Sequence, residues 1–261
     1  LATSATLPLY IWWPRAYGVA SIPACAFLSG VAENIGPVLF YRLFGTTFVP
    51  PAGFLQFTAG LALTSSLVAG AAALRTKSVR GLLAYSTVSQ LGLVLLGLAV
   101  GGFFGILGAV LYMAAHALAK AGLFYAVGLV QDDTTDELVA PGEIAVRSPT
   151  LVAATAVLTF SVVGLPPTIG FAAKLGVLVG AGRSDLLLAI GGAVSALLTL
   201  LYMVRFYTSV FLTGCQQPAA RTSRIGVVLV VLMSLVTVLG GFGWFIPVRL
   251  ITLGLPVGWL P

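Results

Sequence analysis

Seven long apolar stretches, joined by short connections, constrain this chain more than any other feature of its sequence. They lie at roughly 18–44, 53–74, 81–99, 103–130, 148–182, 186–211 and 225–247. A helix needs about 20 apolar residues to cross a membrane. Of the 261 residues 59% are hydrophobic and 8% are charged, whereas about a quarter of the residues in a soluble domain are charged. We therefore predict an all-α polytopic transmembrane helix bundle, a single domain over residues 1–261, with about seven spans and an N-terminal stub at residues 1–10.

The stretch at 148–182 is too long for one straight span. As a continuous helix it would measure about 50 Å, against a hydrocarbon core of about 30 Å, and it contains Gly164-Leu-Pro-Pro167. Two adjacent prolines remove two backbone donors and clash with the preceding turn. The stretch is therefore either two full spans or one span that is broken at Gly164–Pro167.

The distribution of basic residues favours the broken span. That topology gathers most bases on one side of the membrane, as the positive-inside rule expects: Arg15, Arg75, Lys77, Arg80, Arg147, Arg205, Arg221 and Arg224, against Arg42, Arg183 and Arg249. The connection from Arg75 to Arg80 is then cytoplasmic, and the C-terminus lies on the outer side.

Several classes of function find no support in the sequence. The net charge of +6 comes from bases scattered between apolar stretches, which is not the pattern of a nucleic-acid-binding surface. No connection is long enough for a soluble catalytic domain, and a single His leaves neither a Ser-His-Asp set nor a metal-ligand cluster. We expect no catalytic centre, metal or redox cofactor in this chain, and we interpret Cys25 and Cys215 as apolar helix residues. Because the chain begins at Leu1 without a signal-peptide pattern, we expect an upstream part to be missing.

Four ionisable residues fall inside the predicted spans: Glu33, His116, Lys120 and Lys174. An ionisable group at this depth costs several kcal/mol, so it usually faces the bundle interior and marks an ion or proton pathway. His116 and Lys120 are four residues apart and share one helix face. A snorkelling lysine beside a carbonyl-bonded histidine would explain the same pair, but Lys120 lies about 15 Å from the helix end.

Lys174 gives the sharpest signal, because it follows the Pro-Pro break by seven residues. A broken span leaves free backbone groups that must line a cavity, and a desolvated lysine there alternates between charged and neutral forms. Glu33 lies mid-span beside Gly and Pro residues. It has three alternative roles: a proton carrier, a partner for a lysine, or a residue near a helix kink. Arg80 is at a predicted helix start, either beside the same path or as an anchor at the membrane interface.

Four segments, in the right order, resemble motifs of one family. Ser4–Ala16 resembles K-S-A-x-x-P-x-H-x-W-L-P-D-A from its serine onward, and Arg80–Gly92 resembles K-R-L-L-A-Y-S-S-x-S-Q-x-G. His116–Phe124 is similar to H-A-x-x-K-A-L-L-F, and Gly164–Lys174 matches G-x-P-P-x-x-G-F-x-x-K. These motifs are those of the proton-conducting antiporter-like subunits, which comprise the large antiporter-like subunits of respiratory complex I, their relatives in membrane-bound hydrogenases, and Mrp-type cation/proton antiporters.

The resemblance implies a fold of fourteen helices, built as inverted five-helix repeats with one broken helix in each. The chain would then cover helices seven to fourteen. Lys174 takes the position of the basic or acidic residue at the outlet of the proton path, and His116 and Lys120 take those of the central relay.

Other positions depart from the family pattern. The family lysine of the first broken helix falls on Thr3, and the lysine of the next helix falls on Asn34, beside Glu33. The His of P-x-H-x-W is Tyr10, and the Asp of L-P-D-A is Arg15.

Two functions of different class follow as expectations. The first is a proton- or cation-translocating subunit of a larger respiratory, hydrogenase or Mrp-like complex, with Glu33, His116, Lys120, Lys174 and Arg80 as proton-path residues. The second is a non-conducting membrane anchor for a peripheral redox or hydrolytic-type module, such as a hydrogenase or an inorganic-carbon uptake complex. In both cases the partners are other membrane subunits and lipid, and the location is the inner or plasma membrane of a prokaryote. The sequence does not separate H⁺ from Na⁺.

Overall fold

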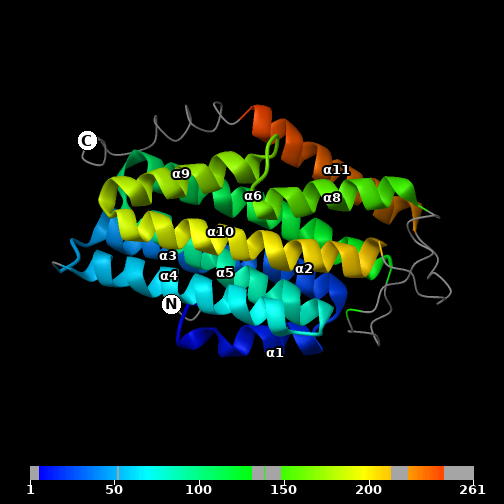
Figure 1. Cartoon of the computed structure of the whole chain (residues 1–261), viewed down its shortest axis with the longest axis horizontal. Helices are drawn as coiled ribbons and strands as arrows, with labels where there is room; N and C mark the ends of the chain where they lie inside the picture. The colour runs from blue at the N-terminus through cyan, green and yellow to red at the C-terminus, as the bar shows by residue number, and fades with distance from the viewer. Residues whose placement is uncertain (1–5, 52, 131–137, 139–147, 213–222, 244–261) are drawn as a thin grey trace.

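The computed structural model describes residues 6–51, 53–130, 138, 148–212 and 223–243. In these segments the chain forms helices and no strands, and Figure 1 shows the helices lying side by side along the long axis of the molecule. The elements are a 3-10 turn η1 (Leu9–Ile11), α1 (Trp12–Val19), α2 (Ile22–Gly30), a 3-10 turn η2 (Ala32–Asn34), α3 (Ile35–Phe40), a π-helical turn η3 (Tyr41–Thr47), α4 (Phe54–Arg75), α5 (Val79–Val100), α6 (Gly102–Gly128), α8 (Pro149–Val163), α9 (Ile169–Ser184), α10 (Leu186–Tyr207), a π-helical turn η4 (Thr208–Leu212) and α11 (Arg224–Phe242).

Within the described residues, six helical segments are long and apolar enough to cross a membrane. They are Ile22–Thr47, Phe54–Arg75, Val79–Val100, Gly102–Gly128, Leu186–Leu212 and Arg224–Phe242. The remaining predicted span corresponds to the shorter helices α8 and α9. The prediction of an all-α polytopic bundle is confirmed.

The first span begins later than the sequence indicated. We expected one helix from residue 18, but α1 ends at Val19 and α2 begins at Ile22. Pro23 stands in the first turn of α2, where its missing N–H costs nothing, while its ring prevents the α1 helix from continuing through this point. Residues 12–19 therefore form a separate short helix that packs against α5, at the lower edge of the bundle in Figure 1.

The same span is distorted again at η2, where Glu33 lies. Pro37 has no N–H, so it cannot donate the helical hydrogen bond to the carbonyl of Glu33, four residues earlier. The chain forms a 3-10 turn between α2 and α3 at this point. The distortion lies in the middle of the span and places the Glu33 side chain in the bundle interior.

Helix α5 is the centre of the bundle. Only Tyr85 and Val100 along it are not buried, and it packs against α1, α3, α4, α6, α9 and α10. Ser78 is the N-cap residue before α5, and its hydroxyl accepts a hydrogen bond from Gly81 N at 2.8 Å. Because α5 is surrounded, its polar side chains point at other helices.

Helices α6 and α9 approach one another very closely. A Cβ atom on Gly108 would collide with the backbone N of Val177 and lie 2.9 Å from the carbonyl O of Ala173. From the other side, a Cβ on Gly176 would lie 2.9 Å from Gly108 Cα. Glycine on both helices allows this approach and brings α9 against the helix that carries His116 and Lys120.

The predicted break at Gly164–Pro167 is confirmed. Helix α8 ends at Val163, and Gly164 adopts the left-handed conformation at φ 84°, which glycine reaches without steric cost. The next helix, α9, begins only at Ile169. Figure 1 shows α9 and α8 end to end above α10, which contacts both of them. The two helices therefore form one broken span, as the distribution of bases favoured.

Candidate functional site

The four ionisable side chains expected inside the spans are all buried. Their exposed fractions are 0% for Glu33, 1% for His116, 0% for Lys120 and 4% for Lys174. They come from three parts of the fold: the 3-10 turn η2, helix α6 and helix α9. Among the described residues, Glu33 is the one buried carboxylate, whereas two lysines are buried.

Lys174 occupies the broken span. The backbone carbonyls of Val162 and Val163 would normally accept hydrogen bonds from residues 166 and 167, which are both proline and have no N–H. Lys174 Nζ donates to these carbonyls instead, at 3.0 Å to Val162 O and 2.9 Å to Val163 O. The ammonium group thus replaces the two backbone donors that the prolines remove. The break and the lysine form one structural unit.

Lys120 is bound differently, by helix α5. Its Nζ donates to the carbonyl O of Leu83 at 2.8 Å and to the hydroxyl of Ser86. Ser86 in turn donates to the same Leu83 carbonyl at 2.8 Å. Within the described residues, Lys120 therefore has no hydrogen bond to a carboxylate, although Glu33 is close enough to interact with it electrostatically.

Glu33 and His116 form a direct pair. Glu33 Oε1 lies 2.6 Å from His116 Nδ1, which is the short distance of a charge-assisted hydrogen bond. Among the described residues, neither Glu33 Oε2 nor His116 Nε2 has a hydrogen-bond partner. Each member of the pair therefore keeps a second atom that is able to accept or release a proton.

Tyr112 links the pair to Lys174 and was not singled out from the sequence. It lies one turn before His116 on α6, with 6.4 Å between the ring centroids at an interplanar angle of 74°. The ammonium of Lys174 lies 5.6 Å from the centroid of the Tyr112 ring. The spacing of Tyr112, His116 and Lys120 at four-residue intervals, on one helix face, is the signal that would have identified it.

A second group that the sequence analysis did not use lies behind Tyr112. The Tyr112 hydroxyl donates to Gln90 Oε1, and Gln90 Nε2 donates to Thr199 Oγ1 at 3.0 Å and to the Tyr202 hydroxyl. All four side chains are fully buried. This group joins α6, α5 and α10 through hydrogen bonds.

Arg80 is also buried, with an exposed fraction of 6%. It stands in the first turn of α5, and its Nη1 donates to the carbonyl O of Ala20 at 3.3 Å, just after the end of α1. This contact joins α5 to the residue that follows α1. The role of Arg80 beside a proton path stays a prediction.

The positions that depart from the family motifs are also placed. Asn34 is half-buried and donates to Gly30 O at 3.4 Å, while Tyr10 packs edge-on against Tyr85 with 6.5 Å between the ring centroids. Arg15 is exposed. Thr3 lies outside the described residues. Of the two cysteines, Cys25 is buried with its Sγ 3.6 Å from the carbonyl O of Tyr17, and Cys215 lies outside the described residues.

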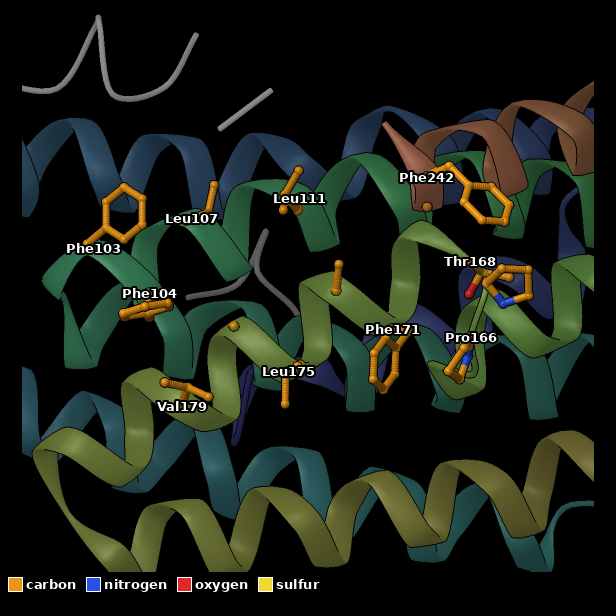
Figure 2. Close-up of a pocket in the computed structure, with 14 residues that line it drawn as sticks. Phe103, Phe104, Leu107, Leu111, Pro166, Thr168, Phe171, Leu175, Val179 and Phe242 are labelled. Carbon is orange, nitrogen blue, oxygen red and sulfur yellow. The ribbon is translucent and has the colours of Figure 1, made fainter. Parts of the chain in front are cut away.

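An apolar groove of about 670 Å³ lies against the break, whose Pro166 and Pro167 line part of it. Its walls come from α6, α9 and α11 and include Phe104, Leu107, Phe171, Leu175 and Phe242, which Figure 2 shows around the opening. None of the four buried ionisable side chains lines it. The groove is therefore separate from the polar interior, and the candidate site is the line of groups from Glu33 to Lys174.

Apolar helices around a line of buried lysine, histidine and glutamate, with a broken span at one lysine, define a class: polytopic membrane proteins with ionisable groups in the bundle interior. The family model described as NADH:quinone oxidoreductase/Mrp antiporter, TM, matches residues 1–199. The chain belongs to this family of transmembrane subunits.

Similar proteins agree with this assignment. NADH-quinone oxidoreductase subunit N of Desulforudis audaxviator is 34% identical over 225 residues, covering 84% of this chain and 45% of that protein. A chain of the Mrp complex from Dietzia sp. DQ12-45-1b has the same fold, with a TM-score of 0.84 at 22% identity over 95% of this chain and 55% of that one. A chain of respiratory complex I from Thermus thermophilus aligns with a TM-score of 0.82 at 22% identity, covering 95% and 56%. The chain spans about half the length of the curated relatives it matches.

Proposed function

We propose that this chain translocates protons as a membrane subunit of a larger respiratory, hydrogenase or Mrp-like complex. The observation that carries the proposal is the set of four buried ionisable side chains along one side of α6. An isolated buried charge is costly, yet this chain keeps two lysines, a histidine and a glutamate among apolar helices. Each has hydrogen-bond partners that stabilise it in place, and none lines the apolar groove between α6, α9 and α11.

The proposed path runs along α6, with the Glu33–His116 pair between Lys120 on one side and Lys174 on the other. The Glu33–His116 pair takes up a proton, since the pair shares a short hydrogen bond and keeps Glu33 Oε2 and His116 Nε2 available. Lys120 lies one turn further along the same helix face, and Lys174 lies at the break on the other side of Tyr112. Each lysine alternates between ammonium and amine, with its charge state set by the proton on its neighbour. Arg80 acts beside this path as a fixed positive charge, because a guanidinium keeps its proton.

We further propose that the chain corresponds to helices seven to fourteen of the family fold and is inserted in a prokaryotic inner or plasma membrane. Its expected partners are other membrane subunits, lipid and a peripheral redox or hydrolytic-type module. The resemblance to the family and the share of the related chains that this one covers support these proposals.

One observation favours the second candidate, a non-conducting anchor for a peripheral module. Asn34 stands where the family pattern has a lysine, and its side chain donates to the backbone of its own helix. The anchor function predicts that the buried groups serve only packing and that substitution of Lys120 has no effect on ion movement.

The test is ion flux in liposomes. The complex is purified through a tag on this chain, the copurifying chains are identified, and the complex is reconstituted with a pH dye inside the vesicles. We expect a K⁺ diffusion potential to drive proton uptake above that of empty liposomes, and Lys120→Met to reduce it to the empty-liposome level. Flux that follows a Na⁺ gradient instead would identify sodium as the transported ion. Equal flux in the wild type and in empty liposomes, with a peripheral module bound, would support the anchor.

A further inference from the structure

Tyr112 lies between two of the proposed proton-carrying groups. Its ring meets the imidazole of His116 at 6.4 Å on one side, and the ammonium of Lys174 lies 5.6 Å from the ring centroid on another. The face of an aromatic ring carries partial negative charge and attracts a cation within about 6 Å. Lys174 already donates to Val162 O and Val163 O, so the ring of Tyr112 is a third stabilising contact for its charged form.

The orientation of Tyr112 depends on Gln90. Gln90 Nε2 donates toward α10, to Thr199 Oγ1 at 3.0 Å and to the Tyr202 hydroxyl. With both amide hydrogens directed at α10, the carbonyl Oε1 is turned toward α6, where it accepts the proton of the Tyr112 hydroxyl. Thr199 completes the arrangement, since its hydroxyl accepts from Tyr202 at 3.2 Å and donates to Ser195 O at 2.8 Å.

The direction of these bonds explains why an amide stands at this position. Glutamine offers two donors and one acceptor group in one plane, and all of them are used here. A methionine has only a weakly accepting thioether and would leave the buried phenol without a good acceptor, which costs more than the bond itself contributes. Gln90 also keeps its protons at any ordinary pH, so the hydrogen-bonded group behind Tyr112 holds the ring without becoming a further proton carrier.

We propose that Gln90 is a positioning residue, whose amide holds the ring of Tyr112 against Lys174 and between Lys174 and His116. The inference rests on the proposed function, because it assigns Gln90 and Tyr112 to the same proton path. Gln90 and Tyr112 carry no charge, and both act through the position of the Tyr112 ring. Without the Tyr112–Gln90 hydrogen bond the ring turns away, the charged form of Lys174 loses its aromatic contact, and proton transfer to Lys174 slows.

The experiment uses the reconstituted complex with four single variants and one double variant. We expect Gln90→Met and Tyr112→Phe each to lower proton flux by about three- to tenfold, the loss of one buried hydrogen bond and of the ring contact that it holds. The double variant is expected to show the same loss as either single one, because both remove the same bond. Gln90→Glu, which keeps an acceptor for the phenol, is expected to restore most of the flux. Thr237→Val is the matched control, because the buried Thr237 hydroxyl donates to Met233 O in its own helix.

A vibrational measurement separates positioning from transport. Infrared difference spectra of the wild type against Tyr112→Phe identify the phenol C–O band of Tyr112 in complex labelled with ring-¹³C tyrosine. We expect this band to shift in Gln90→Met and to stay in place in Gln90→Glu and Thr237→Val. If Gln90→Met does not assemble, Tyr112→Phe and Gln90→Glu still decide the question, since both are nearly isosteric.

Two results would overturn the inference: losses that multiply in the double variant, or a Tyr112 band that is the same with and without the Gln90 amide. Failure of the proposed function looks different. In that case the wild type moves no protons above empty liposomes, while the Tyr112 band still responds to Gln90→Met.

Discussion

Lys174 has two roles: it donates hydrogen bonds to the free carbonyls at the break, and in our proposal it carries a proton. Different substitutions of Lys174 separate the two roles. Lys174→Met removes both roles. It leaves the carbonyls of Val162 and Val163 without their donor, at 2.9 and 3.0 Å in the native protein. Each buried carbonyl left unpaired costs about 1–3 kcal/mol, so we expect a destabilisation of about 2–6 kcal/mol. The methionine offsets part of this cost, because it spares the desolvation of an ammonium group.

Lys174→Gln is the matched variant that keeps one role. Its amide nitrogen has two N–H donors for the two carbonyls and lies about one bond short of the lysine nitrogen, but it neither gains nor loses a proton. Lys174→Arg keeps the donors and the charge and likewise does not release its proton. We therefore expect Lys174→Gln and Lys174→Arg to unfold close to the wild-type temperature, whereas Lys174→Met unfolds earlier.

Proton flux decides between the two roles. All three variants are expected to assemble and to bring flux in dye-loaded liposomes down to the level of empty vesicles. The thermal unfolding temperature in detergent and the yield of copurifying subunits measure whether the broken span remains stable. Wild-type flux in Lys174→Gln, with the break intact, would refute the proposal that Lys174 carries a proton and would leave it as a structural cap.

The remaining predictions concern the other buried groups and the packing. Glu33→Gln keeps an acceptor for His116 but takes up no proton, so we expect flux to be lost with assembly preserved; flux at the wild-type rate would remove Glu33 from the path. Gly108→Ala places a Cβ against the backbone of α9, and we expect a loss of about 1–3 kcal/mol in thermal or denaturant unfolding. The control is Gly60→Ala, where nothing lies within 4 Å of the added atom, and equal effects of the two substitutions would contradict the close-packing argument. Arg80→Met loses the bond to the carbonyl after α1 and is expected to destabilise the protein by about 1–3 kcal/mol, with flux per assembled complex retained; a loss of flux at full assembly would place Arg80 in the path itself.

Much of the fold followed from the sequence because the bilayer imposes strict rules on length and polarity. The apolar stretches predicted the spans, and Gly164 with the two prolines predicted the break, since missing N–H groups and a glycine suited to positive φ are local properties. The start of the first span was predicted wrongly, at residue 18, because the apolar pattern there is continuous. Apolar residues continue through Val19 and Ala20, and the run does not show that Pro23 starts a new helix there.

The ionisable residues of the site could also be predicted from the sequence, because a charged residue within an apolar stretch is easy to identify. Glu33, His116, Lys120 and Lys174 were identified in this way, and all four are buried. Gln90 is neutral, and its importance depends on bonds to residues far away in the sequence, so composition gave no reason to single it out.

The partners of each buried group, in contrast, were decided by tertiary structure. The sequence left open whether Glu33 is a proton carrier, a partner for a lysine or a residue near a helix kink, and it did not single out a histidine as its partner. The packing of α2 and η2 against α6 brings it to His116 at 2.6 Å, while Lys120 turns to α5. Hydrogen bonds form over about 3 Å, so which groups meet depends on how glycines let helices approach and where prolines bend them. The sequence alone determined that charges are buried in a broken-helix bundle, and only the packing determined the order in which those charges meet.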